Sequence, residues 1–444
     1  MPRLRLPHPL VLLLAGVLFA AALTHVVPAG RYDRREDPAT GRTVVVAGTY
    51  RAVEPAPVGP FAAFVAVPRG IVAAAEVVVL ILLVGGAWTV VDKAGTLARL
   101  VGGLSRRFAD RRPVVIALIS AAFAAGGALE NMQEEIIPLI PVLLVLARSL
   151  GFDLVTVAAM SVGAAMVGSA FSPLNPFQAG IALELAELPL LSRSGLRTGM
   201  LLVAMALWIW WTLRHAARHG STPVSGARPE REEFGGRDGI IVLLVLAPFV
   251  VYVIGVLRWG WGFNELSAVF LIAGIAVGLA GRLGLGGTIE AYLTGMRSVV
   301  GAAVLVGVAR AISLVLEDGQ VIDTILQAFV TPLSTAPPAL AAVLMVPVQA
   351  LIHIPVASVS GQAALTMPVM VPLSDLLGFS RDAAVLAYQT GAGLTELWTP
   401  TNGALMAILL AAGVPYGKWI RFVAPIVAIL TLLGIVGLLL ALSR

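Results

Sequence analysis

The chain is largely apolar, but it contains two polar, proline-containing segments, residues 134–180 and 361–407, which are similar to each other and lie 227 positions apart. The segments align without a gap. Their matched positions are Pro141 and Pro368, Gly151 and Gly378, Pro173 and Pro400, and Asn175 and Asn402. Helix breakers at matched places in two halves of a membrane protein are typical of transporter binding sites. The repeat therefore predicts two related halves whose breaks contribute to one binding site.

The composition excludes a water-soluble globular protein. Hydrophobic residues make up 58% of the 444 positions and charged residues only 12%, whereas soluble proteins are charged at about a quarter of their positions. The net charge of +5 does not indicate nucleic-acid binding, because the arginines lie in short loops between apolar segments, where they orient membrane helices. There are no cysteines, which excludes disulfides and thiolate chemistry. We therefore expect an all-α polytopic protein in a lipid bilayer.

Apolar segments long enough to cross a hydrocarbon core, which takes about 20 helical residues, predict about nine transmembrane helices. The first segment has the charged and apolar regions of a signal peptide, but it stays apolar through Val27 and further spans follow, so we interpret it as a retained helix. The expected spans are 8–28, 70–92, 153–189 (broken at Pro173 and Pro176), 195–214, 239–257, 265–281, 298–316, 381–413 (broken at Pro400) and 417–441.

Residues 113–148 and 336–375 differ from these spans. Each contains two apolar arms around a polar centre, and an arm of roughly 16 residues rises only about 24 Å as a helix. We interpret both as re-entrant hairpins, whose irregular turns require a cavity or neighbouring protein to satisfy them. Two ordinary helix pairs with polar outer loops are the alternative.

The basic residues of the short loops predict the orientation. The segments 93–112 and 214–237 are rich in arginine and fall on the same side, which we expect to be cytoplasmic together with the N-terminus. An odd number of crossings separates the spans that begin near 70 and 298, so the halves form an inverted repeat. The expected organisation is a first half at 1–214, a cytoplasmic linker at 215–238 and a second half at 239–444, with the first hairpin open to the cytoplasm and the second to the exterior.

The two breaks supply the first candidate binding residues, which are Ser172, Asn175, Thr399, Thr401 and Asn402. Proline removes an amide donor and frees the carbonyl one turn back. Freed carbonyls, hydroxyls and asparagine oxygens suit a sodium ion, while exposed half-helix N-termini favour a substrate carboxylate. A tolerated kink is the alternative. We predict no metal site other than this possible sodium site.

The hairpin centres supply the second set. Glu134 and Glu135 are costly at membrane depth, which makes them candidates to bind an amine, a proton or a cation. A solvated loop is the alternative. His353, near the second centre, is interpreted as a structural histidine, and a pH-sensitive group is the alternative. The remaining candidates are Asn131, Ser358, Ser360, Gly361 and Gln362.

Arg310 lies within an expected span and must pair with an acid or bind an anionic ligand. Glu76 and Glu317 are its candidate partners. Glu184, Glu187 and Glu396 are further intramembrane carboxylates whose partners the sequence does not predict. No nucleophile elbow, HExxH zinc motif or phosphate-binding loop is present, so we expect neither an enzyme nor a cofactor.

Several strings resemble a known family. They are Leu23–Tyr32, Glu134–Glu135, Asn175–Phe177, Ala309–Arg310, Ser360–Pro368, Pro400–Gly403 and Val414–Trp419. The chain resembles the YfcC branch of the DcuC-type carriers, in the ion transporter superfamily that includes p-aminobenzoyl-glutamate transporters. The resemblance implies a homodimeric, multi-pass carrier of the bacterial inner membrane that moves its substrate by an elevator motion. Gly391-Ala-Gly393 replaces the expected Gly-Asp-Gly, which puts any coupling role of that aspartate in doubt.

These observations predict a secondary active transporter of a small carboxylate-bearing metabolite, an amino acid or a four-carbon dicarboxylate, coupled to a sodium or proton gradient. The acidic residues of the first hairpin favour an amino acid, whose amine they would meet. An exchanger of basic amino acids, which the YfcC branch implies, is the alternative. A channel is a different class, for which we would expect ohmic currents instead of saturable uptake.

Overall fold

The computed structural model describes residues 9–37, 42–96, 99, 111–220, 235–259 and 261–442. Most of the expected linker, residues 221–234, lies outside the described residues. The described chain is predominantly helical, with two short antiparallel strand pairs, which confirms the prediction of a mostly helical membrane protein.

The bounds of the elements follow the order of the chain. The first half contains α1 (Pro9–Val26), β1 (Gly30–Arg31), β2 (Arg34–Asp37), β3 (Arg42–Val45), β4 (Arg51–Ala52), α2 (Pro60–Ala73), α3 (Ala75–Lys93), α5 (Arg112–Glu130), η1 (Glu134–Leu139), α6 (Ile140–Leu150), α7 (Leu154–Ala158), η2 (Ala159–Gly163), α8 (Ala164–Phe171), η3 (Pro176–Gly180), α9 (Ile181–Leu185) and α10 (Ser194–His219). The second half contains α11 (Gly236–Trp259), α12 (Phe263–Ala280), α13 (Gly284–Asp318), α14 (Ile322–Leu333), α15 (Pro338–His353), α16 (Val359–Leu377), α17 (Arg381–Thr395), α18 (Gly403–Ala411) and α19 (Tyr416–Leu440).

Seven helical segments of the described chain are long and apolar enough to cross a membrane: α3, α5, α7 to α9 taken together, α10, α12, α13 and α19. The helix α5 was expected to be a short hairpin arm, but its 19 residues place it in this group. Its partner α6 has 11 residues, and α15 of the second hairpin has 16. The number of crossings and the re-entrant character of the hairpins stay predictions.

Two regions differ from the expected layout. The segment 29–69, expected to be a loop, contains the four strands and most of α2. A proline at the first turn of α2 suits a helix start, because that position needs no amide donor. The helix α13 has 35 residues instead of covering only 298–316, because the glycines at 284–287 begin the helix and do not interrupt it.

The helices α2 and α3 pack closely on α13. Shifting α13 back by 227 positions places it on residues 57–91, which α2 and α3 cover. A Cβ added to Gly70 would lie 2.3 Å from the Gly307 carbonyl oxygen, and one added to Gly86 would lie 2.2 Å from the Tyr292 ring. Residue numbers rise along α2 and α3 while their neighbours fall along α13, so the matched segments run antiparallel. Small residues at these positions let the helices approach closely.

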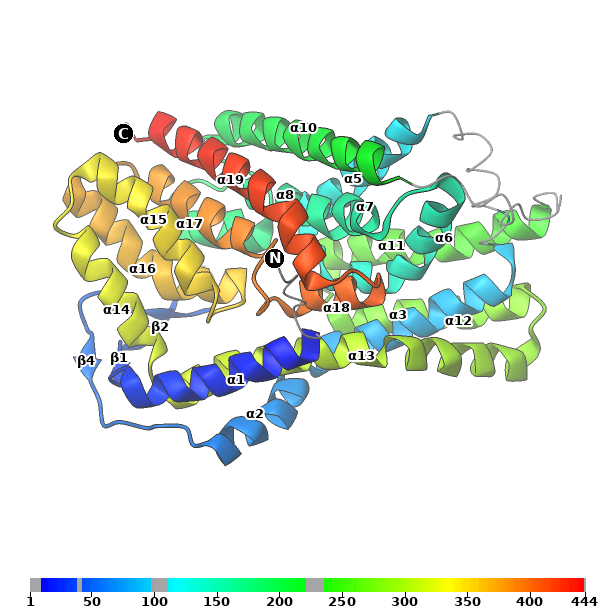
Figure 1. The fold of residues 1–444 in the computed structure, drawn as a ribbon, viewed down its shortest axis with the longest axis horizontal. Helices are drawn as coiled ribbons and strands as arrows, with labels where there is room; N and C mark the ends of the chain where they lie inside the picture. The colour runs from blue at the N-terminus through cyan, green and yellow to red at the C-terminus, as the bar shows by residue number, and fades with distance from the viewer. Residues whose placement is uncertain are drawn as a thin grey trace, which may run out of the picture.

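The two broken helices occupy the interior. From α7 to α8, every residue from 155 to 171 is buried, and every residue of α17 from Asp382 to Thr395 is buried. The Gln389 side-chain amide donates to the Ser172 carbonyl oxygen at 3.0 Å, which joins α17 to the break after α8. Figure 1 shows α1, α3 and α13 along one side of the molecule and α10 with α19 along the opposite side. The breaks therefore lie between layers of long helices.

Candidate functional site

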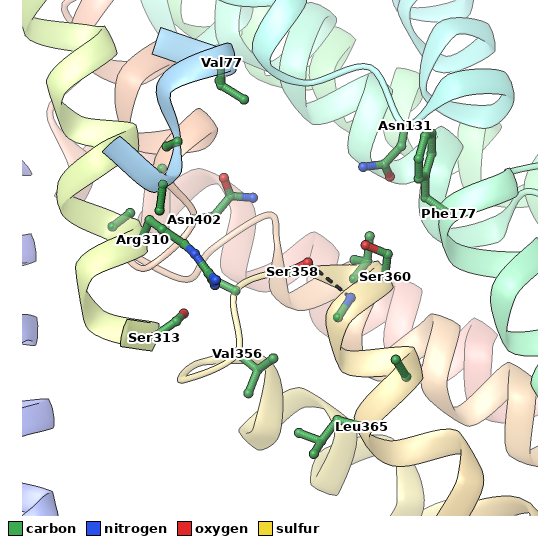
Figure 2. Close-up of a pocket in the computed structure, with 18 of the residues that line it drawn as sticks. Val77, Asn131, Phe177, Arg310, Ser313, Val356, Ser358, Ser360, Leu365 and Asn402 are labelled. Atoms are coloured by element: carbon green, nitrogen blue, oxygen red, sulfur yellow. Dashed lines mark hydrogen bonds between the residues drawn. The ribbon is translucent and has the colours of Figure 1, made fainter. Parts of the chain in front are cut away.

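A cavity of about 1630 Å³ lies where both hairpin turns meet the second helix break. Its walls come from the end of α5 and η1, the turn between α15 and α16, the break between α17 and α18, and α13. Figure 2 shows Asn131 and Phe177 on one side of this space and Arg310 and Ser313 of α13 on the other. Residues from both halves therefore enclose one space.

Nine of the thirteen candidate residues line the cavity: Asn131, Glu134, Glu135, Arg310, Ser358, Ser360, Gly361, Thr401 and Asn402. The other four, Ser172, Asn175, Gln362 and Thr399, are fully buried in the surrounding protein. The structure thus brings the hairpin residues and the second break together, while the polar side chains of the first break lie behind the wall.

The first break is tied to the first hairpin. The Asn175 side-chain nitrogen donates to the Gly127 carbonyl oxygen at 2.7 Å, and its oxygen accepts from the amides of Phe177 and Gln178. The Ser172 hydroxyl donates to the Ala128 carbonyl oxygen at 2.7 Å. These side chains cap η3 and hold α8 against α5, so their polar atoms are occupied in this conformation.

The second break connects the two halves. The Asn402 side-chain oxygen accepts from the Leu405 amide at 2.9 Å and so caps α18. Its side-chain nitrogen donates to the Gln133 side-chain oxygen at 3.1 Å. The hydroxyls of Thr399 and Thr401 lie 2.7 Å apart. Asn402 thus reaches the hairpin turn of the first half, whereas Asn175 bonds within its own half.

Carboxylates concentrate on the wall formed by the first hairpin turn and the second break. Glu130, Glu134, Glu135 and Glu396 all line the cavity there. The Gln133 backbone amide donates to Glu135 at 3.1 Å, and its side-chain nitrogen donates to Glu396 at 2.6 Å. In the part of the chain that the structure describes, no arginine or lysine forms an ion pair with these four carboxylates. This acidic wall suits a cationic group.

Arg310 supplies positive charge on the other side of the cavity. Its side chain is 41% exposed and extends from α13 toward the turn that carries Ser358 (Figure 2). Its guanidinium lies 3.4 Å from Glu317, one of the two predicted partners. The other, Glu76, instead accepts from the Asn264 side chain at 2.9 Å. An exposed pair of this kind is weak, so Arg310 remains accessible to an anionic group.

The N-terminal strands close part of the cavity, which the sequence did not predict. Gly30, Arg31 and Arg34 line it together with Asp323 of α14. Asp323 accepts from the Tyr32 backbone amide and from the Arg34 guanidinium, both at 2.9 Å. Burial and the Asp323 carboxylate raise the pKa of Tyr32 to about 12, so this tyrosine stays protonated. The strand segment is therefore anchored to α14 beside the cavity.

Sequence reasoning also missed Gln133 and left Glu396 without a partner. For Glu396, a signal was present in the repeat. Both Glu396 and Ser169, its equivalent 227 positions earlier, are polar residues that lie four residues before the matched prolines, Pro400 and Pro173. No comparable signal distinguished Gln133 from other polar residues of the hairpin centre, because its role depends on Glu396 and Asn402, which are distant in the chain.

Comparisons with known proteins find several similar chains. The chain is 31% identical over 386 residues to the Escherichia coli K12 protein named "Putative basic amino acid antiporter YfcC", covering 81% of this chain and 76% of that protein. It is 26% identical to an uncharacterized protein of Haemophilus influenzae, covering 98% and 97% of the two chains. Among solved structures it is similar to the YdaH transporter of Alcanivorax borkumensis, with 19% identity, a TM-score of 0.45 and 98% coverage of both chains. MtrF of Neisseria gonorrhoeae, described among antimetabolite efflux pumps, gives 19% identity, a TM-score of 0.43 and coverage of 98% and 94%.

The sequence profile of one transporter family covers almost the whole chain. The DcuC family, described as C4-dicarboxylate anaerobic carrier, matches residues 6–443. This match confirms the resemblance inferred from the sequence strings. The apolar helices, the large cavity between them and this match agree, and the chain belongs to the DcuC family of membrane transporters.

Proposed function

We propose that this protein is a secondary active transporter of a small carboxylate-bearing metabolite, and that the metabolite is an amino acid. The observation that carries the proposal is the division of charge across the cavity. Glu134 and Glu135 lie on one wall and Arg310 on another. An α-amino acid offers an ammonium group to the first and a carboxylate to the second.

A four-carbon dicarboxylate suits this cavity less well. Two unit charges about 4 Å apart interact by roughly 4 kcal/mol near a protein surface. One carboxylate of such a substrate would meet Arg310, while the other would face the acidic wall of Glu130, Glu134, Glu135 and Glu396. Because more acidic than basic groups line the cavity, an amino acid with its ammonium group fits better than a dicarboxylate.

The second candidate is an exchanger of basic amino acids. A side-chain cation in addition to the α-ammonium would use more of the acidic wall. The relative named as a basic amino acid antiporter supports this candidate by similarity. Exchange and symport differ in whether transport requires a substrate on both sides of the membrane, which an assay can separate.

The proposed mechanism is alternating access in an inverted repeat, with sodium or protons as the coupling ion. The antiparallel packing of α2 and α3 on α13 supports the inversion. We propose halves at 1–214 and 239–444, hairpins and broken helices that move as an elevator against a dimeric scaffold, and a bacterial inner-membrane location with a cytoplasmic N-terminus.

Uptake into proteoliposomes tests the proposal. Labelled arginine, alanine and succinate sample a cationic, a zwitterionic and a dianionic substrate. We expect saturable uptake of an amino acid that excess succinate does not inhibit. Preferred uptake of succinate would reverse the substrate assignment, and ohmic currents in planar bilayers would indicate a channel. Counterflow without an ion gradient distinguishes an exchanger from a strict symporter.

A further inference from the structure

We propose that Glu396 and His353 form a proton-binding site that couples protons to transport through the adjoining cavity. The inference rests on the proposed function, because coupling has meaning only in a transporter. Glu396 lies in the break after α17, its side chain is 7% exposed, and it lines the cavity. His353 ends α15 and is fully buried. The Glu396 carboxylate and the His353 Nε2 atom lie 3.8 Å apart.

Backbone groups fix which atom of each amide side chain faces Glu396. The Leu405 backbone amide can only donate, so the atom of Asn402 that accepts from it is the side-chain oxygen. The other atom of Asn402 is then its NH2 group, which donates to the Gln133 oxygen. The Gln133 NH2 group is left to donate to Glu396 Oε2 at 2.6 Å. A donor and not an oxygen therefore meets Glu396 Oε2, which opposes a metal cation at that oxygen, while Oε1 faces His353.

The hydrogen bonds of Gln362 fix the tautomer of His353. The Gln349 backbone carbonyl can only accept, so the Gln362 atom that lies 2.8 Å from it is the NH2 group. The Gln362 oxygen then faces His353 Nδ1 at 2.7 Å, and Nδ1 must carry the hydrogen. A neutral His353 therefore presents a lone pair at Nε2, an atom that is buried and has no hydrogen-bond partner among the described residues.

Two acceptors thus face each other across a gap about 1 Å longer than a hydrogen bond. A single proton satisfies both: it makes either a carboxylic acid that donates to Nε2 or an imidazolium that donates to the carboxylate. Without that proton, a carboxylate and a lone pair repel each other. The pair therefore has a place for one exchangeable proton, and binding it draws the break toward the second hairpin.

Besides His353, the ionisable group nearest Glu396 in the described chain is Glu134 of η1, whose carboxylate lines the same wall of the cavity. From α16 the pair meets the neutral amide of Gln362. Arg310 of α13 lines the same cavity but has Glu317 as its neighbour. No described arginine or lysine forms an ion pair with Glu396 that would remove the need for a proton.

Gln133 connects this site to the substrate wall. Its backbone amide donates to Glu135, and its side chain donates to Glu396. A substrate ammonium that binds Glu135 and moves this turn changes the donor offered to Glu396. By thermodynamic linkage, protonation of Glu396 then changes substrate affinity by the same factor.

The repeat supplies an internal comparison. The equivalent of Glu396 in the first half is Ser169, which donates to the Asn131 side-chain oxygen and accepts from Asn175. That half has a neutral hydroxyl where the second half has a carboxylate. The proton site therefore belongs to the second break alone.

Proton and substrate fluxes measured together in proteoliposomes test the inference. A pH-sensitive dye inside the vesicles reports protons, and labelled arginine and alanine are the substrate probes. We expect coupled proton flux in the wild type and its loss in Glu396→Gln, because the glutamine NH2 group satisfies His353 permanently. Glu290→Gln, which neutralises an exposed carboxylate on α13, is the matched control and retains the flux ratio. His353→Gln is expected to flatten the pH profile of uptake.

The outcomes distinguish failure of the proton site from failure of the proposed transporter function. Substrate counterflow in the wild type without proton flux overturns the proton site and leaves the transporter proposal intact. No flux of any probe counts against the proposed function. If Glu396→Gln transports too slowly to measure, proton release on adding substrate to the detergent-solubilised proteins replaces the flux assay. Equal release by wild type and Glu396→Gln then overturns the inference.

Discussion

Asn402 of the second helix break donates its side-chain amide to Gln133 of the first hairpin turn, at 3.1 Å. The two residues are 269 positions apart. Because Gln133 also donates to Glu396, a single glutamine holds the end of α17 and the start of α18 against the turn before η1. The cavity wall is therefore assembled from both halves of the repeat.

Replacing Gln133 by alanine removes this connection. A hydrogen bond to a charged group contributes about 1.5–3 kcal/mol, so we expect kcat/KM for uptake to fall about tenfold or more. Ser334→Ala, at an exposed position directly after α14 and away from the breaks, is the control. Uptake kinetics of Gln133→Ala equal to those of the wild type would show that the connection does not matter for transport.

Charge changes on opposite walls have different effects on different substrates. We expect Glu134→Gln and Glu135→Gln to raise KM for arginine, by about tenfold for each 1.4 kcal/mol of lost attraction. Arg310→Gln should weaken binding of every substrate that carries a carboxylate. Inhibition of labelled-substrate uptake by unlabelled arginine, alanine or succinate measures the affinity of each variant for the three probes. The exposed Glu54→Gln is the control. If the glutamate variants lose affinity equally for all three probes, the acidic wall is not specific for cations.

The two matched asparagines should differ in what their loss affects. Asn175 caps η3 and makes four hydrogen bonds, three of them buried, so Asn175→Ala is expected to lower the melting temperature, since loss of a cap costs about 0.5–2 kcal/mol. Asn402 caps α18 with fewer hydrogen bonds and also lines the cavity, so Asn402→Ala should lower the melting temperature less and reduce saturable uptake. Thermal unfolding and uptake of both variants test this. The prediction fails if Asn402→Ala transports normally.

Close packing of α2 on α13 depends on Gly70. A Cβ there would lie 2.3 Å from the Gly307 carbonyl oxygen and 2.8 Å from the Ala311 nitrogen. Overpacking of this kind costs about 1–3 kcal/mol, so Gly70→Ala should lower the melting temperature. Gly199→Ala on α10, where a Cβ meets nothing within 4 Å, should leave it equal or higher. A rise in the melting temperature of Gly70→Ala would mean that the helices separate at no cost.

Asp323 anchors the N-terminal strands beside the cavity. Asp323→Asn removes the Arg34 ion pair and weakens the bond to the Tyr32 amide, so we expect faster tryptic cleavage after Arg31 or Arg34. Asp33→Asn, which breaks an exposed pair with Arg51, is the control because such pairs contribute little. Limited proteolysis followed by mass spectrometry measures the rates. Equal rates for the two variants would show that Asp323 does not anchor the strands.

The repeat and the apolar segments predicted much of the fold. Helical membrane architecture follows from composition, and the family follows from the resemblance of several sequence strings; both are confirmed. The breaks at Pro173 and Pro400 were predictable because proline disrupts helical hydrogen bonding wherever it lies within a helix. The strands between Gly30 and Ala52 were not predictable, since their pairing and their contacts with α14 join distant segments.

For the site, sequence chemistry identified which residues are costly to place in a membrane, and nine of thirteen candidates line the cavity. It did not distinguish Asn175 from Asn402, because both follow a proline at the same spacing. Only the tertiary structure separated them: the Asn175 side-chain nitrogen donates to the Gly127 carbonyl and the Ser169 hydroxyl, within its own half, while that of Asn402 donates to Gln133.

The sequence alone determined that this protein is a helical membrane carrier whose long spans contain breaks, because apolar length and helix breakers act locally along the chain. The tertiary structure decided which polar groups of the two halves meet. It placed Glu396 between Gln133 and His353, and it left Arg310 accessible on the opposite wall. Such pairings depend on how the antiparallel halves pack against each other, and spacing within either half does not encode them.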